Sequence, residues 1–312
     1  MWALFSVDFS RIDTGKTVCF LVSGGLSRGR LLFPFYCTFF SWRISSAIWR
    51  IMLLRNRTSS SRSSTRLRGT VSEYRGTAQF VAGRIRLAAE DDPVDASALV
   101  PTAPIDRAAA MEDLRRWVES ITDPDYRAVA DAMLTAHGDA LCAIPAAKSV
   151  HHAFLGGLLM HTANMLKIAD FLADMYPETI DRSLLLAGTL LHDMAKEQEF
   201  VFSQLGLATD YSIKGQLLGH LVMGAQDAAE TAARLGIPEE KSVLLQHLIL
   251  SHHGEPEFGA AVRPLCAEAE LLSLIDSVDS RMEIYRETCD TMEPDTFSPR
   301  IFALEKKIFK HR

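Results

Sequence analysis

The chain has 312 residues, enough for one large domain or two domains of ordinary size. Hydrophobic residues make up 48% and charged residues 23%, which excludes a disordered, collagen-like or disulfide-scaffold protein. The net charge of −6 is an average over two unlike parts. Residues 1–68 carry 11 basic and 2 acidic residues, or +9, whereas residues 69–312 carry 22 basic and 37 acidic residues, or −15. The charge pattern therefore predicts a boundary near Arg66.

Cysteine usage and hydropathy indicate the compartment. The cysteines are odd in number and widely spaced, without a C-x-x-C pair: Cys19, Cys37, Cys142, Cys266 and Cys289. This argues against a thiolate zinc site and predicts reduced thiols. The longest apolar run near the start, residues 31–40, is shorter than the roughly 20 residues of a membrane span and lies too far along the chain for a signal peptide. We therefore expect a cytoplasmic protein with no membrane role.

Residues 1–65 show neither a helical period nor sustained strand alternation. Aromatic residues cluster over 33–42, and serine and arginine dominate over 58–66. Two interpretations remain open: a basic, aromatic element that faces RNA, or an atypical or wrongly translated start, such as a frame error upstream of about Arg66. The second interpretation is favoured.

Residues 67–87 predict two strands joined at Arg75-Gly76, because β-branched and aromatic residues alternate with polar ones on both sides. A lone hairpin is marginal in water, so this one should belong to a small sheet or barrel that includes earlier residues. Tyr74 and Arg75 lie at its tip and could contact RNA, with an unliganded exposed tip as the alternative. Residues 1–90 are thus expected to form an N-terminal module.

Residues 91–106, acidic and proline-containing, predict a linker, and the periodicity of 107–312 is helical. The expected helices cover 107–121, 124–137, 149–175, 181–196, 214–235, 238–253, 265–290 and 299–310. Leucines between 184 and 191 predict a strongly apolar central helix. The expected fold class is mainly α, a helical bundle preceded by a β module.

Nine of the ten histidines lie between His137 and His253. His192-Asp193 ends the apolar helix, and an ionisable pair there is costly unless something such as a divalent cation compensates it. Lys196 lies one turn later, placed to meet a phosphate oxygen or the Asp193 carboxylate. Further candidates follow apolar stretches on separate helices: His161, His220, His252, His253 and Asp276. A lone histidine of this kind is usually a hydrogen-bonded core residue, but a converging set is hard to explain that way. We expect His137 at the surface and His247 in a structural role.

The order H…HD…H…HH…D over residues 145–290 resembles the HD-domain superfamily of metal-dependent phosphohydrolases. The resemblance implies that one metal ion is held by His161, His192, Asp193 and Asp276, and a second by the bridging Asp193 with His220, His252 and His253. Two such ions activate a water and stabilise a phosphoryl displacement, so Asp193 and Lys196 are the expected catalytic residues. Mn²⁺ is the expected ion, with Fe, Co, Ni or Mg as alternatives. Asp279, one turn after Asp276, could replace it as ligand.

Four runs narrow the resemblance to the YhaM-type 3′–5′ exoribonuclease family: 148–162, 184–193, 215–220 and 247–254. That family joins an N-terminal OB-fold to a C-terminal HD domain, and the hairpin over 66–87 looks like the last part of the OB-fold. An OB-fold binds single strands through a basic groove and stacking aromatics. The resemblance implies a metal-dependent phosphodiesterase acting on single-stranded RNA. His151 and His152 could line the substrate path, with a helix-start hydrogen-bonding role as the alternative.

Other functions remain open. An HD phosphohydrolase acting on nucleotides or cyclic dinucleotides needs the same ligands, and related folds also host di-iron oxygenase chemistry. A catalytically silent RNA-binding protein is the non-enzymatic alternative. Single-stranded RNA is the expected partner, with single-stranded DNA as an alternative, and the sequence is compatible with a homo-oligomer.

Overall fold

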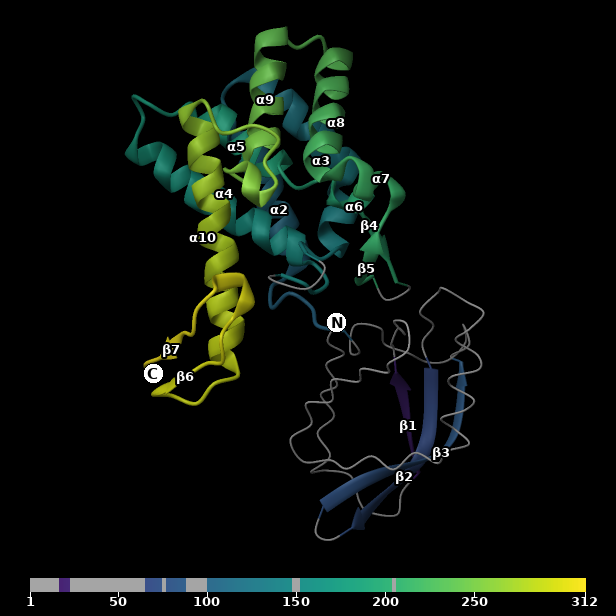
Figure 1. Cartoon of the computed structure of the whole chain (residues 1–312). Helices are drawn as coiled ribbons and strands as arrows, with labels where there is room; N and C mark the ends of the chain where they lie inside the picture. The colour runs from purple at the N-terminus through teal and green to yellow at the C-terminus, as the bar shows by residue number, and fades with distance from the viewer. Residues whose placement is uncertain (1–16, 23–64, 75–76, 88–99, 148–151, 204–205) are drawn as a thin grey trace. The chain divides into compact units, whose positions relative to one another are not determined.

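The computed structural model describes residues 17–22, 65–74, 77–87, 100–147, 152–203 and 206–312 (Figure 1). The chain divides into two compact units. One unit comprises residues 1–101 with 203–205, and the other comprises 102–202 with 206–312. The split near residue 101 lies inside the predicted linker.

The first unit contains an antiparallel sheet of three described strands in the order β1-β2-β3: β1 (Thr17–Val22), β2 (Thr65–Tyr74) and β3 (Thr77–Leu87). Tyr74 pairs with Thr77, so the chain reverses direction between them, as the hairpin pattern predicts. β1 pairs with β2, with Thr17 opposite Thr70. The hairpin thus belongs to a sheet that includes an earlier segment, as expected. The sequence TVCFLV of β1 lacks the polar alternation that would have indicated a strand.

The second unit is a helical bundle, as predicted. Its helices are α2 (Arg107–Ser120), α3 (Pro124–Ala143), α4 (Gly157–Met175), α5 (Arg182–Leu191), α6 (Lys196–Glu199), α7 (Ile213–Leu217), α8 (Gly219–Leu235), α9 (Glu239–Ser251) and α10 (Ala267–Asp290). Two short antiparallel pairs accompany them: β4 (Phe200–Phe202) with β5 (Ala208–Tyr211), and β6 (Thr296–Phe297) with β7 (Phe309–Lys310). Among the described helices, none is both long and apolar enough to cross a membrane.

Aspartates define where several helices begin. Asp106, Asp123 and Asp181 precede α2, α3 and α5, and the side chain of each accepts two backbone N–H groups of its helix. These bonds satisfy donors that have no partner within the helix. Pro124 fits the first position of α3, where no N–H is needed.

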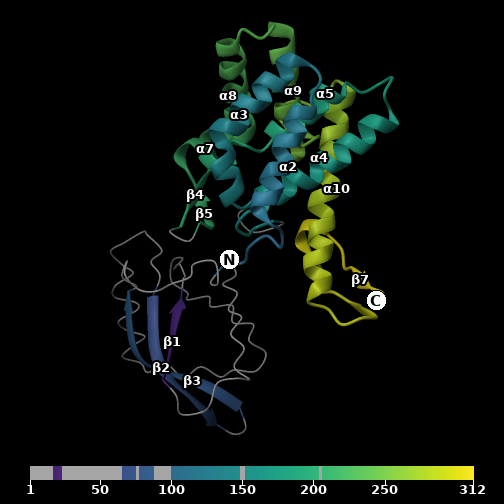
Figure 2. The same cartoon turned by 180° about the vertical axis from the view of Figure 1, so that it is seen from behind.

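α5 is the centre of the bundle. Every residue from Ser183 to Leu191 is buried, in agreement with the predicted central apolar helix. α3, α4, α9 and α10 all pack against it (Figure 2). Its C-terminal end delivers His192 and Asp193 into the interior, where both side chains are buried.

Gly188 allows α5 and α9 to approach closely. A Cβ at this position would come within 2.2 Å of Leu248 Cδ2. We expect Gly188→Ala to lower the free energy of unfolding by about 1–3 kcal/mol, the usual cost of overpacking a core. Gly138→Ala in α3 is the matched control, because its Cβ would meet nothing closer than 3.5 Å. Equal urea midpoints for the two variants would contradict this close contact.

Several predicted helices differ from the structure in their extent. The helix predicted over 124–137 continues to Ala143, and the helix predicted over 181–196 ends at Leu191. Residues 152–156 are not helical, and α4 begins only at Gly157, after Gly156 adopts a left-handed φ of 72°. The predicted helix over 214–235 is divided into α7 and α8 at Gly219, where φ is 71°. At Gly156 and Gly219, glycine permits a backbone conformation that interrupts the helical period.

The predicted helix over 299–310 is wrong. Ile301 donates its N–H to the carbonyl of Lys306, and Ser298 donates to the carbonyl of Ile308, so the chain folds back on itself. Leu304 and Ile308 then pack against Ile284 of α10 in a small separate core. The spacing of these apolar residues arises from a β-type reversal rather than from one helix face.

Candidate metal centre

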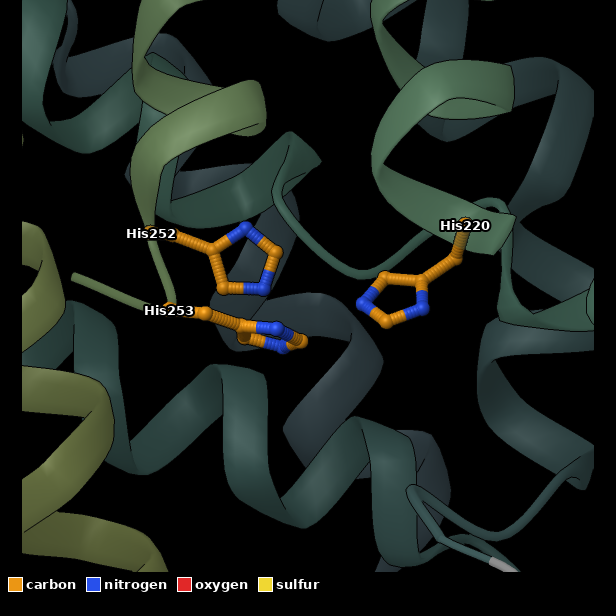
Figure 3. Close-up of side chains that lie close together, drawn as sticks. All are labelled: His220, His252 and His253. Atoms are coloured by element: carbon orange, nitrogen blue, oxygen red, sulfur yellow. The ribbon is translucent and has the colours of Figure 1, made fainter. Parts of the chain in front are cut away.

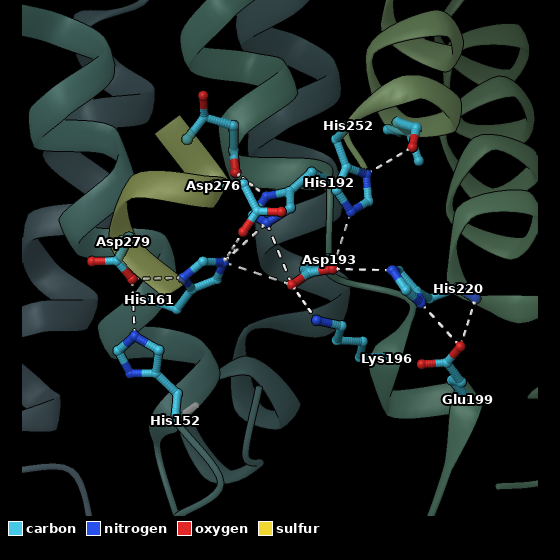
Figure 4. A network of polar contacts seen from close by, with 12 residues as sticks. His152, His161, His192, Asp193, Lys196, Glu199, His220, His252, Asp276 and Asp279 are labelled. Atoms are coloured by element: carbon cyan, nitrogen blue, oxygen red, sulfur yellow. Dashed lines mark hydrogen bonds and ion pairs between the residues drawn. The ribbon is translucent and has the colours of Figure 1, made fainter. Parts of the chain in front are cut away.

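Side chains from α4, α8, α9, α10 and the end of α5 meet around Asp193 (Figure 4). The cluster contains all seven candidate ligands named from the sequence: His161, His192, Asp193, His220, His252, His253 and Asp276. Five of them are buried, and His253 and Asp276 are partly buried. The fold thus brings together residues that lie up to 115 positions apart in the chain.

The first group of donors lies around His161. Its Nε2 is 3.4 Å from Nε2 of His192 and 3.3 Å from Oδ1 of Asp276. Oδ2 of Asp193 lies 3.8 Å from the same nitrogen of His161 and 3.4 Å from Nε2 of His192. Two imidazoles and two carboxylates therefore converge on one small volume.

The second group contains His220, His252 and His253 (Figure 3). Oδ1 of Asp193 faces Nε2 of His220 at 3.3 Å and Nε2 of His252 at 3.6 Å. The ring of His253 lies 4.4 Å from that of His252 and 5.2 Å from that of His220, measured between centroids. Asp193 thus presents one oxygen to each of the two groups.

Several buried polar atoms at this centre have no hydrogen-bond partner among the described residues: Asp193 Oδ1, His220 Nε2, His252 Nε2 and His253 Nδ1. Unsatisfied buried polar atoms are costly and rare. One ring nitrogen from each of His220, His252 and His253 lies within 4.8 Å of the other two. In the same way, one ring nitrogen of His161, one of His192 and one carboxylate oxygen of Asp193 all lie within 4.8 Å of one another. This donor set fits divalent transition-metal ions, for which imidazole and carboxylate are suitable ligands.

Backbone carbonyls orient two of the imidazoles. Nδ1–H of His192 donates to the carbonyl of Thr189 at 2.7 Å, and Nδ1–H of His252 donates to the carbonyl of Ile249 at 2.8 Å. In each ring the proton is then on Nδ1, which leaves Nε2 free to bind a metal. Both Nε2 atoms face Asp193.

Carboxylates orient two further imidazoles. Nδ1–H of His161 donates to Oδ2 of Asp279 at 2.7 Å, and Nδ1–H of His220 donates to Oε1 of Glu199 at 2.9 Å. Sequence reasoning considered Asp279 as a ligand and missed Glu199 entirely. The one available signal for Glu199 is its position three residues after Lys196, which puts both on one face of a helix.

The charges at the centre stabilise one another. Burial would raise the pKa of Asp193, but Lys196 and His192 hold it well below its usual range. Burial would lower the pKa of Lys196, but Asp193, 2.5 Å from its Nζ, raises it. Both groups are therefore charged near neutral pH, as an ion pair inside the site.

The imidazoles differ in protonation. Burial would lower the pKa of His161, but Asp276 and Asp279 raise it to about 9. Burial lowers the pKa of His252, and burial with the neighbouring His252 and His220 lowers that of His253 to about 3. His252 and His253 are thus neutral, the form that binds metals, whereas His161 must release a proton to do so.

Of the remaining predicted site residues, His152 lies beside the cluster, with its ring 5.3 Å from that of His161 between centroids. His152 is fully buried, and its Nε2 is 2.9 Å from Oδ2 of Asp279, which favours the hydrogen-bonding role over an open substrate path. His151 and Arg75 are outside the described residues. Tyr74 ends β2, of which only the backbone is described.

The predictions for the two other histidines, His247 and His137, have different outcomes. His247 has the expected structural role, since its Nε2 accepts the backbone N–H of Leu265 at 2.9 Å. His137 was predicted at the surface and is partly buried: its side chain is 17% exposed, and its Nδ1 pairs with Glu197 at 2.5 Å.

This His137–Glu197 pair predicts a pH-dependent contribution to stability. The hydrogen bond to Glu197 raises the pKa of His137 despite burial. The pair therefore makes its full contribution to the stability of the folded state at pH values below the unfolded-state pKa of about 6.5. The contribution is lost as pH rises through the higher folded-state pKa. Glu197→Gln should therefore cost up to about 1 kcal/mol at pH 6 and less at pH 9, by urea unfolding. A cost that grows with pH would contradict this assignment.

Comparison with known proteins identifies the class of this fold and site. Residues 158–281 match the family model of the HD domain. This segment runs from α4 to α10 and includes every ligand candidate named above.

The similarity to curated proteins extends over most of the chain. The 3′-5′ exoribonuclease YhaM of Bacillus pumilus is 32% identical over 266 residues, 85% of this chain and 83% of that protein. YhaM of Halalkalibacterium halodurans is 37% identical over 241 residues, covering 77% and 74%, and YhaM of Bacillus subtilis is 34% identical over 241 residues, covering 77% and 76%. The chain therefore belongs to the YhaM 3′–5′ exoribonuclease family, and the resemblance seen in the sequence is confirmed. No solved structure matches.

Proposed function

We propose that this protein is a metal-dependent 3′–5′ exoribonuclease that hydrolyses single-stranded RNA at the Asp193 centre. The main observation in support is that the buried Asp193 carboxylate directs one oxygen toward each of two groups of imidazoles. The relatives named 3′-5′ exoribonuclease, aligned over three quarters or more of this chain, support the reaction and the substrate.

Two divalent ions would be held here, with Mn²⁺ the first choice. The first would take His161, His192, Asp193 and Asp276, and the second would take Asp193, His220, His252 and His253. When bound, such a pair supplies an activated water and stabilises charge on the attacking and leaving oxygens. The orphaned Nε2 atoms of His220 and His252 support the second set.

Asp276 is the better first-group ligand than Asp279. Oδ1 of Asp276 faces Nε2 of His161, the nitrogen on the metal side of the ring. Oδ2 of Asp279 accepts from Nδ1 of His161 and lies 2.9 Å from Nε2 of His152, so it is already engaged on the opposite side. Asp279 is thus assigned to holding His161 in place.

Lys196 contributes a positive charge next to the reacting phosphate. Its Nζ pairs with Oδ2 of Asp193, and its side chain is 12% exposed. An ammonium group fixed in a buried site stabilises developing phosphate charge more strongly than one in water. Lys196 and Asp193 are therefore the two residues assigned a direct part in the reaction.

The first unit is assigned to binding the RNA strand. The three-stranded antiparallel sheet supports a β module within residues 1–90, and an OB-fold there would bind single strands with Tyr74 and Arg75 near its hairpin tip. Residues 91–106 would then link this module to the HD domain over 107–312. His151 is retained as a substrate contact.

Labelled RNA tests the proposal directly. With Mn²⁺, 5′-labelled single-stranded RNA should yield a ladder of shortening products, and 3′-labelled RNA should lose its label at the first step. Single-stranded DNA run in parallel measures the preference for RNA. Folded protein that leaves RNA intact, or that turns over only free nucleotides or cyclic dinucleotides, would contradict the proposal.

A further inference from the structure

Glu199 is a buried acid outside the assigned ligand set. It is 7% exposed, and its Oε1 accepts two bonds from His220: Nδ1–H at 2.9 Å and the backbone N–H at 3.1 Å (Figure 4). We infer that Glu199 is a positioning residue that orients His220 and strengthens it as a ligand of the second metal ion. This inference rests on the metal centre proposed above.

The bond to Glu199 determines which ring nitrogen of His220 is available. With the proton on Nδ1 and directed at Oε1, Nε2 carries the free lone pair. That nitrogen lies 3.3 Å from Oδ1 of Asp193 and has no hydrogen-bond partner among the described residues. A carboxylate behind a ligating imidazole fixes its orientation and raises its basicity.

The backbone bond fixes where α8 begins. Leu218, the residue before α8, provides no side-chain cap, and the turn at Gly219 has a left-handed φ of 71°. Glu199 supplies the missing acceptor from another helix by receiving the N–H of His220. One oxygen therefore holds both the ring and the backbone of this ligand.

Glu199 is itself held firmly. Its carbonyl accepts the N–H of Ser212 at 2.8 Å, and a Cβ on Gly215 would lie 2.2 Å from the same carbonyl oxygen. α7 therefore packs directly against the Glu199 backbone. The side chain starts from a constrained position, which suits a group that must orient another.

The short helix α6 contributes one contact to each of two residues of the centre. Lys196, its first residue, pairs with Oδ2 of Asp193, and Glu199, its last, pairs with His220. In the second group, His252 is oriented only by a neutral carbonyl, and Nδ1 of His253 has no partner in the described part of the chain. His220 is thus the ligand of that group with a charged carboxylate behind it.

Titration with Mn²⁺ alone tests the inference. Unmodified protein should bind two ions, and Glu199→Gln, which keeps an oxygen acceptor but removes the charge, should weaken one of the two by about 10–100-fold. Glu197→Gln, two residues away on the same helix, is the control and should bind both ions normally. Glu199→Ala also removes the acceptor, and it should lose the Nδ1-protonated His220 signal in ring ¹⁵N spectra of metal-free protein.

The outcomes are distinguishable. Mn²⁺ affinities that are the same in Glu199→Gln and unmodified protein would overturn the role of Glu199, whatever the activity toward RNA. Selective weakening of one ion would support it, even if RNA proved not to be the substrate.

Discussion

Asp193→Ala should abolish RNA hydrolysis, lowering turnover by roughly 10³-fold or more, since the variant removes the oxygen donor shared by both ligand groups and the partner of Lys196. The helical unit should remain folded, because the core around α5 does not depend on this side chain. Turnover of labelled RNA and far-ultraviolet circular dichroism measure the two effects.

Asp131→Ala is the matched control for this variant. Asp131 is an exposed aspartate of α3 and is not part of the cluster, so its loss should leave turnover unchanged. If Asp193→Ala retained more than a tenth of the control's activity, the assignment of the centre would be wrong.

Removal of metal should lower the melting temperature of the protein by roughly 5–10 °C. The metal-free centre contains buried nitrogen and oxygen atoms with no hydrogen-bond partner among the described residues. An ion present at 100 times its Kd stabilises the native state by about 2.7 kcal/mol, and each kcal/mol shifts the melting temperature of a domain of this size by about 2–4 °C. Thermal denaturation with excess Mn²⁺ and with EDTA measures the difference.

Asp193→Ala again provides the internal comparison. Its melting temperature should respond little to either Mn²⁺ or EDTA, since it lacks the donor shared by both groups. A melting temperature of unmodified protein that is the same in Mn²⁺ and EDTA would be incompatible with ions bound at these buried atoms.

The ligand cluster was predictable because its members follow apolar stretches. A polar residue directly after a buried helix, such as His192 after α5, enters the interior, and the cost of burying it calls for a compensating partner. The order of these residues along the chain, which resembles that of HD domains, then predicted that separate helices contribute to one metal centre. The structure brings all seven candidate ligands into one cluster.

The acids that orient the imidazoles were harder to predict from the sequence. Asp276 and Asp279 lie one turn apart on α10, and only the rotation of that helix, about 60° between the two positions, decides which acid meets which nitrogen of His161. Glu199 contacts a residue 21 positions away across the β4–β5 hairpin. No periodicity within a single element encodes such a contact.

The errors in the predicted helices and strands also arise from features that local sequence periodicity does not encode. Gly219 interrupts a continuous helical pattern through its backbone conformation alone. Residues 299–310 have helix-like apolar spacing but pack as a reversal, because Ile284 of α10 offers them an apolar surface. Tertiary contacts outweighed local pattern in both the C-terminal segment and β1, where pairing with β2 defines the strand.

Anomalous diffraction from crystals grown with Mn²⁺ tests the two-ion centre most directly. It should show two manganese peaks, one near each oxygen of Asp193, with His161, His192 and Asp276 around the first and His220, His252 and His253 around the second. A single peak, or peaks that Asp193 does not contact, would contradict a binuclear site bridged by this carboxylate.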